Sequence, residues 1–183
     1  MTEWRLNCYD GKAYTLPSPV AWRLDYGLGS PCDSFWVKTL WSVGQEETLA
    51  AGTRMQVFHD GALCFVGVVD ECEVNQGTEG LRLEVSGRGM AALLLDNEAL
   101  PVEYQQATCA DIIADHVTPY GIETIGGNRL NPVNAFHITS GVSEWSVVEE
   151  FLRYYNGLTP RFDWMGRLLL DPPGDGQTMA VDD

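Results

Sequence analysis

Residues 54–69, RMQVFHDGALCFVGVV, decide how the first half of the chain folds. Two apolar segments flank Asp60-Gly61, a dipeptide that accepts positive φ angles at both central positions of a tight turn. We therefore predict a β-hairpin centred on this dipeptide. Further along, residues 81–86 alternate apolar and polar side chains, which is typical of a strand with one buried face.

The same kind of pattern extends toward the N-terminus. Residues 4–9 and 13–16 are separated by Asp10-Gly11, and residues 20–26 and 33–41 are two further aromatic-rich segments. About seven short strands with a turn signal every 8–14 residues are typical of a small barrel or sandwich.

After about residue 100 the spacing of apolar residues becomes helical. Thr108 and Asp111 are placed as a capping box that starts a helix, and Ser143 is the expected cap of a second one. Asn156-Gly157 offers the second helix a left-handed end, and a further hairpin is expected around Met165-Gly166.

We therefore expect an α+β fold, with an N-terminal mainly-β small barrel followed by a compact two-helix α+β unit. The expected domains are residues 1–100 and residues 101–183, and a mobile tail is expected from about residue 171.

Composition and charge exclude several partners. The chain has 183 residues, with 11 Lys and Arg against 26 Asp and Glu and a formal net charge of −15. It has no Lys/Arg run to neutralise phosphates, so we expect no binding to nucleic acid. The longest apolar run, residues 62–69, is too short to cross a bilayer, so we expect no membrane insertion. Residues 1–9 lack the pattern of a secretory signal, which favours the cytosol. The acidic surface suits either plain solubility or a basic partner.

The residue types that carry chemistry form no recognisable site. The five cysteines are irregularly spaced without Cys-x-x-Cys, and the three histidines match no zinc pattern. Asp70-Glu71 with Glu73 is a weak candidate for a metal site or an acid pair. His116 lies on the apolar face of its helix, where a buried histidine with a backbone partner is favoured over a general base oriented by a carboxylate. We expect no catalytic residue, no cofactor and no metal, and hence not an enzyme.

Tryptophan is the most distinctive component of the chain. Three of the six tryptophans fall close together in the N-terminal half: Trp22, Trp36 and Trp41. Such residues either fill a core or anchor a partner or a sugar ring, because aromatic side chains are enriched both in cores and at the centres of interfaces.

Four segments resemble a known family in their order and spacing. Residues 83–96, LEVSGRGMAALLLD, together with residues 108–121, 141–157 and 162–168, are similar to the baseplate hub proteins of contractile-tailed phages and phage-tail-like particles. The chain departs from the family at Gly89, where an acidic or polar residue often stands. It also ends where family members continue into a second barrel.

The resemblance implies a structural protein of a virion tail baseplate, present in the bacterial host cytoplasm during assembly. It implies a trimer or hexamer ring that links the tail tube to the spike, with tube and spike proteins as partners. Strand edges would join neighbouring copies. Arg88 and Asp96 would then have a structural role, pairing across the turn between them. The alternative is a carbohydrate-binding or cell-wall-degrading module of a tail tip.

Overall fold

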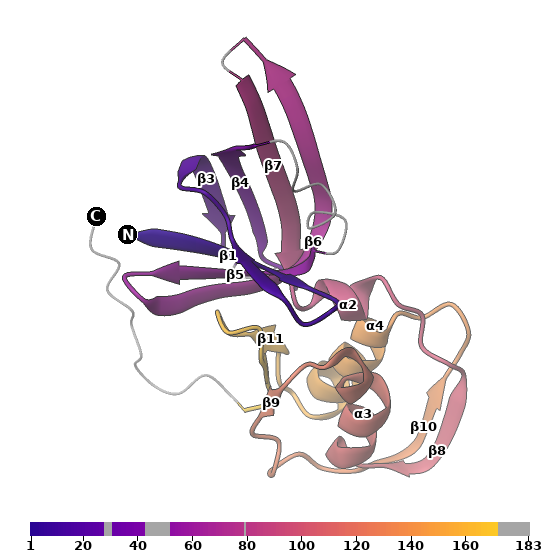
Figure 1. Cartoon of the computed structure of the whole chain (residues 1–183). Helices are drawn as coiled ribbons and strands as arrows, with labels where there is room; N and C mark the ends of the chain where they lie inside the picture. The colour runs from indigo at the N-terminus through magenta and orange to yellow at the C-terminus, as the bar shows by residue number, and fades with distance from the viewer. Residues whose placement is uncertain (28–30, 43–51, 79, 172–183) are drawn as a thin grey trace.

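The structure, a computed structural model, describes residues 1–27, 31–42, 52–78 and 80–171. The chain builds two layers of structure, a curled sheet and a smaller unit that packs against its outside (Figure 1). The described residues confirm the α+β fold class with a sheet-rich first half. The tail expected to be mobile, residues 172–183, lies outside the described part of the chain.

Seven strands form the sheet, in the order β2-β1-β5-β6-β7-β4-β3. Their bounds are β1 Thr2–Cys8, β2 Ala13–Thr15, β3 Pro19–Asp25, β4 Ser34–Leu40, β5 Gly52–His59, β6 Ala62–Gly77 and β7 Gly80–Gly89. All neighbouring pairs are antiparallel. The predicted hairpin is confirmed: β5 and β6 are joined by Asp60 and Gly61, both with positive φ.

The two strands at the ends of this order are consecutive pieces of one chain segment. β2 pairs with β1 and β3 pairs with β4, yet only residues 16–18 separate them. The amide of Leu16 still donates to the carbonyl of Trp4 at 2.8 Å, and the rings of Trp4 and Trp22 lie 6.2 Å apart. The stretch of residues 13–25 therefore curls the sheet into a small, incompletely closed barrel: it pairs with one end strand and then the other, and the far side of β3 has no strand partner among the described residues.

The barrel core needs two glycines on its inner face. The rings of Phe35 and Phe65 meet edge to face at 5.5 Å. A Cβ on Gly87 would lie 2.6 Å from the Phe35 ring and 2.0 Å from the carbonyl oxygen of Val68. A Cβ on Gly67 would lie 2.7 Å from the Phe65 ring. Hydrogen at these positions leaves room for the aromatic pair. The fully buried members of the barrel core are Trp4, Leu6, Phe35, Val37, Met55, Val57, Phe65, Leu83 and Val85.

The remaining elements form a unit with its own core, which we call the helical unit (residues 90–171). They are α2 Ala92–Leu95, β8 Val102–Ala107, α3 Cys109–His116, η1 Thr118–Tyr120, β9 Thr124–Ile125, β10 Val133–Ile138, α4 Glu144–Glu149, the π-helix η2 Glu150–Tyr155, β11 Arg161–Phe162 and β12 Leu168–Leu169. The strands make a β10-β8 pair and a β11-β12-β9 sheet, in which β12 runs parallel to β9.

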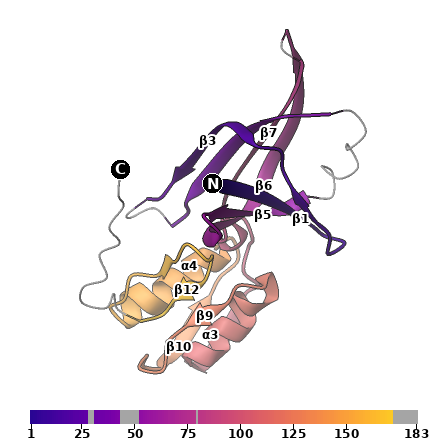
Figure 2. The same ribbon diagram turned by 60° about the vertical axis from the view of Figure 1, so that its left-hand side comes forward.

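Local capping fixes the two helices as expected. The hydroxyl of Thr108 accepts from the amide of Asp111 while the Asp111 side chain accepts from Thr108, so the predicted capping box is confirmed. Ser143 caps α4, and Gly157 has a φ of +68° after the helix ends. Figure 2 shows α3 and α4 on the side of the molecule away from the tip of the β6–β7 hairpin.

Strand β6 is the wall shared by the two cores. Phe65 points into the barrel core, whereas Val66 and Val68 pack against the core of the helical unit. Because successive side chains of a strand point to opposite faces, one strand serves both. Met90 and Leu94 already belong to the second core, while the division of the chain near residue 100 remains a proposal.

No helix among the described residues is long and apolar enough to cross a membrane.

Candidate functional site

Arg88 forms a clamp between the barrel and the helical unit. It ends β7 and donates to Asp70 of β6 at 2.7 and 3.0 Å and to Asp96, just after α2, at 3.0 and 2.5 Å. The guanidinium thus binds two carboxylates side by side, a geometry that suits its planar donors. The pairing of Arg88 with Asp96 is confirmed.

The charges of this clamp stabilise one another. The hydrogen bonds to Asp70 and Asp96 raise the pKa of Arg88. The hydrogen bond from Arg88 lowers the pKa of Asp96. All three side chains are partly exposed, so the clamp acts mainly by fixing the direction in which the chain leaves β7.

Asp70 was missed as a partner of Arg88 by sequence reasoning. It sits where the register between β6 and β7 shifts, between Val69 and Glu71. This bulge breaks the alternation of side chains while the ladder continues, and it turns Asp70 toward Arg88. The carboxylate considered for a metal or an acid pair therefore belongs to an ion pair.

The three candidate tryptophans lie in different surroundings. Trp22 of β3 is 49% exposed, although it pairs across the ladder with the buried Val37. Trp36 of β4 lies on the opposite, outer face of the sheet, where its cross-strand neighbours are Arg23 and Ser86. Trp41 is 9% exposed and belongs to the barrel core.

Trp41 is therefore a core residue, whereas Trp22 and Trp36 present aromatic surface on the barrel wall. The position of Trp41 follows from the register, because its amide donates to the carbonyl of Leu81 and so extends the β4–β7 ladder. The residues next to Trp41 in the sequence do not indicate that its side chain belongs to the core.

Strand β3 is the best placed edge for a contact with another molecule. Its far side pairs with no strand among residues 1–27, 31–42, 52–78 and 80–171. Val20 and Trp22 are exposed along it, and Tyr26 is exposed directly after its end. An exposed strand edge with large apolar side chains is typical of a surface that pairs with another chain.

The ionisable residues of the helical unit form a second cluster, which is buried. His116 is 4% exposed, and its Nδ1 lies 2.6 Å from Oε2 of Glu144, which is 7% exposed. The expectation of a backbone partner for His116 was wrong, because its partner is a carboxylate. The hydroxyl oxygen of Tyr104 lies 3.0 Å from the other ring nitrogen of His116, Nε2. Both ring nitrogens of this buried imidazole therefore have a partner within the helical unit.

Two hollows on the surface have linings that mix polar and apolar groups. One of about 320 Å³ is lined by Lys38, Asn75, Gln76, Gly77, Thr78, Arg82 and Glu84. One of about 600 Å³ is lined by Asn128, Arg129, Leu130, Asn131, Asn156, Leu158, Leu170 and Asp171. Neither hollow is bordered by His116 or by the Arg88 clamp.

The five cysteines all lie within the described residues and form no disulfide there. Burial raises the pKa of Cys32 to about 11. Within residues 1–27, 31–42, 52–78 and 80–171, no group of three His, Cys, Asp or Glu side chains is arranged to hold a metal ion.

The comparisons with known proteins rest on three-dimensional structure. No family model and no curated protein sequence matches the chain. The chain does match solved structures in its fold. The 43 kDa tail protein of prophage MuSo2 from Shewanella oneidensis matches with a TM-score of 0.72 at 20% identity, over 94% of this chain and 56% of that protein.

Two further structures show the same fold. The tail protein from Neisseria meningitidis MC58 matches with a TM-score of 0.67 at 18% identity, over 94% of this chain and 53% of that protein. A chain of the Francisella PdpA–VgrG complex in its lidded form matches with a TM-score of 0.56 at 10% identity, over 100% of this chain and 30% of that chain. This chain thus spans about half the length of the two tail proteins, and at these identities the likeness establishes the fold.

Proposed function

We propose that this protein is a structural, non-enzymatic component of a phage or phage-like tail. It would act as a hub of the baseplate that forms a trimer or hexamer ring and links the tail tube to the spike. The observation that carries the proposal is the match of barrel and helical unit together, in one continuous arrangement, to solved tail proteins over 94% of the chain. The match to a chain of a VgrG complex supports a spike-like partner.

The edge strand β3 is the proposed contact between copies. Pairing of an exposed strand with a strand of a neighbour supplies main-chain hydrogen bonds, and large aromatic side chains supply buried area. Trp22 is suited to this role because it is half exposed and already braced by the ring of Trp4. The Arg88 clamp would hold the barrel at a fixed angle to the helical unit, as a ring of repeated contacts requires.

The proposal is tested by measuring mass in solution. Light scattering after size-exclusion chromatography is applied to the full chain at increasing concentration, alone and with the tube and spike proteins of the same particle. We expect a trimer or hexamer, or a defined complex with one of those partners. A chain that stays monomeric at about 100 μM and binds neither partner would contradict the proposal. A stable interface buries at least about 1,000 Å², and copies joined by such an interface should associate at that concentration.

A pair of matched variants locates the contact. Trp22→Ser is expected to shift the ring toward monomer while its circular dichroism stays that of the folded chain. Trp164→Ser is the control, because Trp164 is 44% exposed but lies on the turn between β11 and β12. Equal effects of the two substitutions would place the contact elsewhere than β3.

A further inference from the structure

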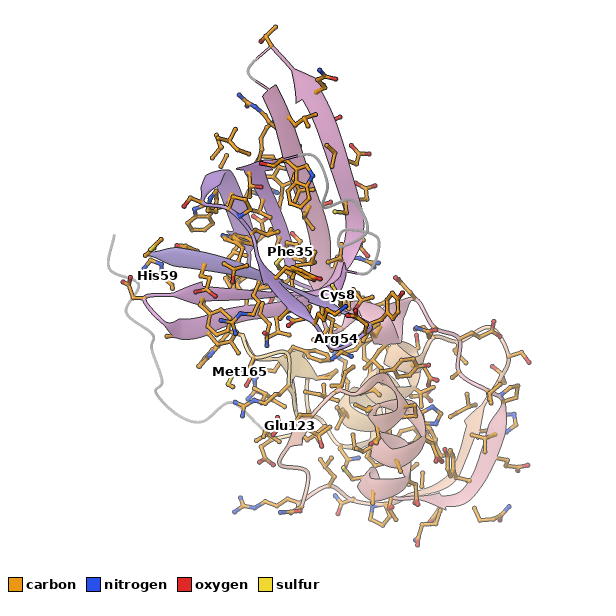
Figure 3. The ribbon with its side chains drawn as sticks, in the orientation of Figure 1. Cys8, Phe35, Arg54, His59, Glu123 and Met165 are labelled. Atoms are coloured by element: carbon orange, nitrogen blue, oxygen red, sulfur yellow. The ribbon has the colours of Figure 1, made fainter. Side chains whose placement is uncertain are left out.

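The larger of the two surface hollows lies in the helical unit and has an apolar bottom with a polar rim. Its volume of about 600 Å³ is within the range of small-molecule sites. Leu170 is 2% exposed, and Leu130 and Leu158 are half-buried. In Figure 3 the label of Glu123 marks the side of the helical unit where the chain enters β9 and then the loop that borders this hollow. The exposed polar residues of the lining are Asn128, Arg129, Asn131 and Asp171.

The loop of residues 126–131, which forms one wall of the hollow, is held at both ends. At its start the amide of Gly127 donates to Oδ1 of Asp171 at 3.2 Å. At its end the amide of Asn131 donates to Oδ1 of Asn156 at 2.7 Å, and the Asn156 side chain donates back to the Asn131 carbonyl at 3.4 Å. The wall is therefore in place before a ligand arrives, which lowers the entropic cost of binding.

The polar groups of the rim are available to a ligand. Within the described part of the chain, the side chains of Asn128, Arg129 and Asn131 have no hydrogen-bond or ion-pair partner, since Asn131 uses only its backbone groups. A carboxamide offers both donors and an acceptor, a guanidinium offers donors, and a carboxylate such as Asp171 offers acceptors. The rim can therefore bind a ligand whose neighbouring groups both donate and accept.

The charges of the lining favour an uncharged ligand. The positive charge of Arg129 and the negative charge of Asp171 balance each other. The chain as a whole carries a formal net charge of −15, which repels anions at long range. A hydroxyl group is uncharged and is both a donor and an acceptor. A sugar ring combines hydroxyls around its edge with apolar C–H faces, and this distribution matches a polar rim around a bottom of leucines.

We propose that this hollow binds a short, uncharged oligosaccharide. The apolar face of a sugar ring lies over the leucines, and its hydroxyls bond to Asn128, Arg129, Asn131 and Asp171. A protein segment is the rival occupant, but the centre of a protein interface is usually depleted of charged residues, whereas Arg129 and Asp171 both line this hollow. The site lies wholly in the helical unit, so the inference is independent of the proposed tail function and of the contact at β3.

The first experiment looks for binding directly. Proton–nitrogen-15 correlation spectra of the full chain are recorded while maltotriose or triacetylchitotriose is added. We expect at least one of these trisaccharides, at up to about 10 mM, to shift the amide signals of residues 126–131, 156–158 and 170–171. Binding of maltotriose alone would identify a plain hexose ligand, and binding of triacetylchitotriose alone an amino-sugar ligand. No shift with either sugar, or shifts spread evenly over the barrel and the helical unit, would overturn the proposal.

A double substitution then removes two of the available rim groups. Asn128→Ala combined with Arg129→Ala breaks no side-chain contact within the described part of the chain, so the fold should be unchanged. We expect the affinity for the trisaccharide to fall at least about tenfold. The control is Asn134→Ala combined with Arg153→Ala, which removes the same kinds of group from outside the hollow and should leave the affinity unchanged. An equal loss in the two proteins, or no loss in the first, would contradict the proposal.

Light scattering of the same double variant separates the sugar from the rival occupant. Sugar binding that this variant abolishes, while its assembly with itself and with the tube and spike proteins is unchanged, supports the proposal. A complex that the variant loses, in the absence of any sugar binding, would make the hollow a protein contact and would overturn it. Because assembly and sugar binding are measured separately, either proposal can fail without the other.

Discussion

The two cores of this molecule are stabilised in different ways, although they share strand β6. The barrel core is packed from aromatic and aliphatic side chains that fit over glycines 67 and 87. The core of the helical unit also contains a histidine and a glutamate whose side chains bond to each other and to two tyrosines. The stability of the first therefore depends on shape, and that of the second also depends on buried hydrogen bonds.

The two halves are therefore expected to tolerate different substitutions. A close-packed apolar core responds to volume and is nearly indifferent to pH. A buried polar network responds to the loss of any one partner, because every buried donor must meet an acceptor. Three substitutions test this difference between the two cores.

The largest expected effect is in the barrel. Gly87→Ala places a methyl group 2.0 Å from the carbonyl oxygen of Val68 and 2.6 Å from the ring of Phe35, so the ladder or the aromatic pair must shift. We expect the free energy of unfolding to fall by about 3 kcal/mol, measured by urea denaturation with circular dichroism.

The matched control is Gly77→Ala, at the end of β6. The nearest atom to its added Cβ is 4.0 Å away, so we expect almost no change. Similar losses for the two variants would mean that chain flexibility, and not the fit around Phe35, explains the result. The loss in Gly87→Ala should also be the same at pH 6 and pH 9, because no ionisable group takes part.

An intermediate effect is expected at the clamp between the two parts. Arg88→Met removes the partner of Asp70 and Asp96, and we expect a loss of about 1 kcal/mol at pH 7, since the three side chains are partly exposed. The pKa of Asp96 is lower in the folded chain than its ordinary value. Its contribution is therefore complete above the unfolded value of about 4 and disappears as the pH falls through the folded value.

The measurement is the difference in unfolding free energy between Arg88→Met and the unsubstituted chain from pH 7 down to pH 2. We expect the difference to shrink on the acid side. Arg153→Met, which removes an exposed pair with Glu149 within one helix, is the control and should cost less. A difference that stays constant on acidification would show that the clamp acts by packing.

The smallest effect is expected at the edge of the helical unit. Ala135 of β10 has a φ of +53°, a left-handed conformation that costs a residue with a Cβ about 1 kcal/mol. Ala135→Gly should therefore raise the melting temperature slightly, with a gain of about 0.5 kcal/mol after the added freedom of the unfolded chain is deducted. Ala114→Gly, in the exposed part of α3, should lower stability instead.

Features set by neighbouring residues could be predicted from the sequence. The turn at Asp60-Gly61, the capping box at Thr108 and the cap at Ser143 are confirmed, because each depends on backbone geometry within four residues. The ion pair Glu149–Arg153 is equally local, because it spans one helical turn. The contact of Arg88 with Asp96, eight residues apart, came from the family resemblance and is also present.

Features that join distant segments could not be predicted. The strand expected to end at residue 69 runs on to Gly77, because the bulge at Asp70 hides the alternation that continues beyond it. The parallel pairing of β12 with β9 joins residues more than forty positions apart. The partner of His116 is Glu144, and the only local signal was an acidic residue in the first turn of a helix, which is common.

The sequence by itself determined where this chain turns, where its helices start and which faces of its strands are apolar, because these depend on local backbone energies and on side-chain periodicity. Only the tertiary structure decided that residues 13–25 curl the sheet into a barrel, that β6 serves two cores, and that His116 meets Glu144. These arrangements depend on which distant surfaces exclude water together. That choice is made by the packing of the whole chain.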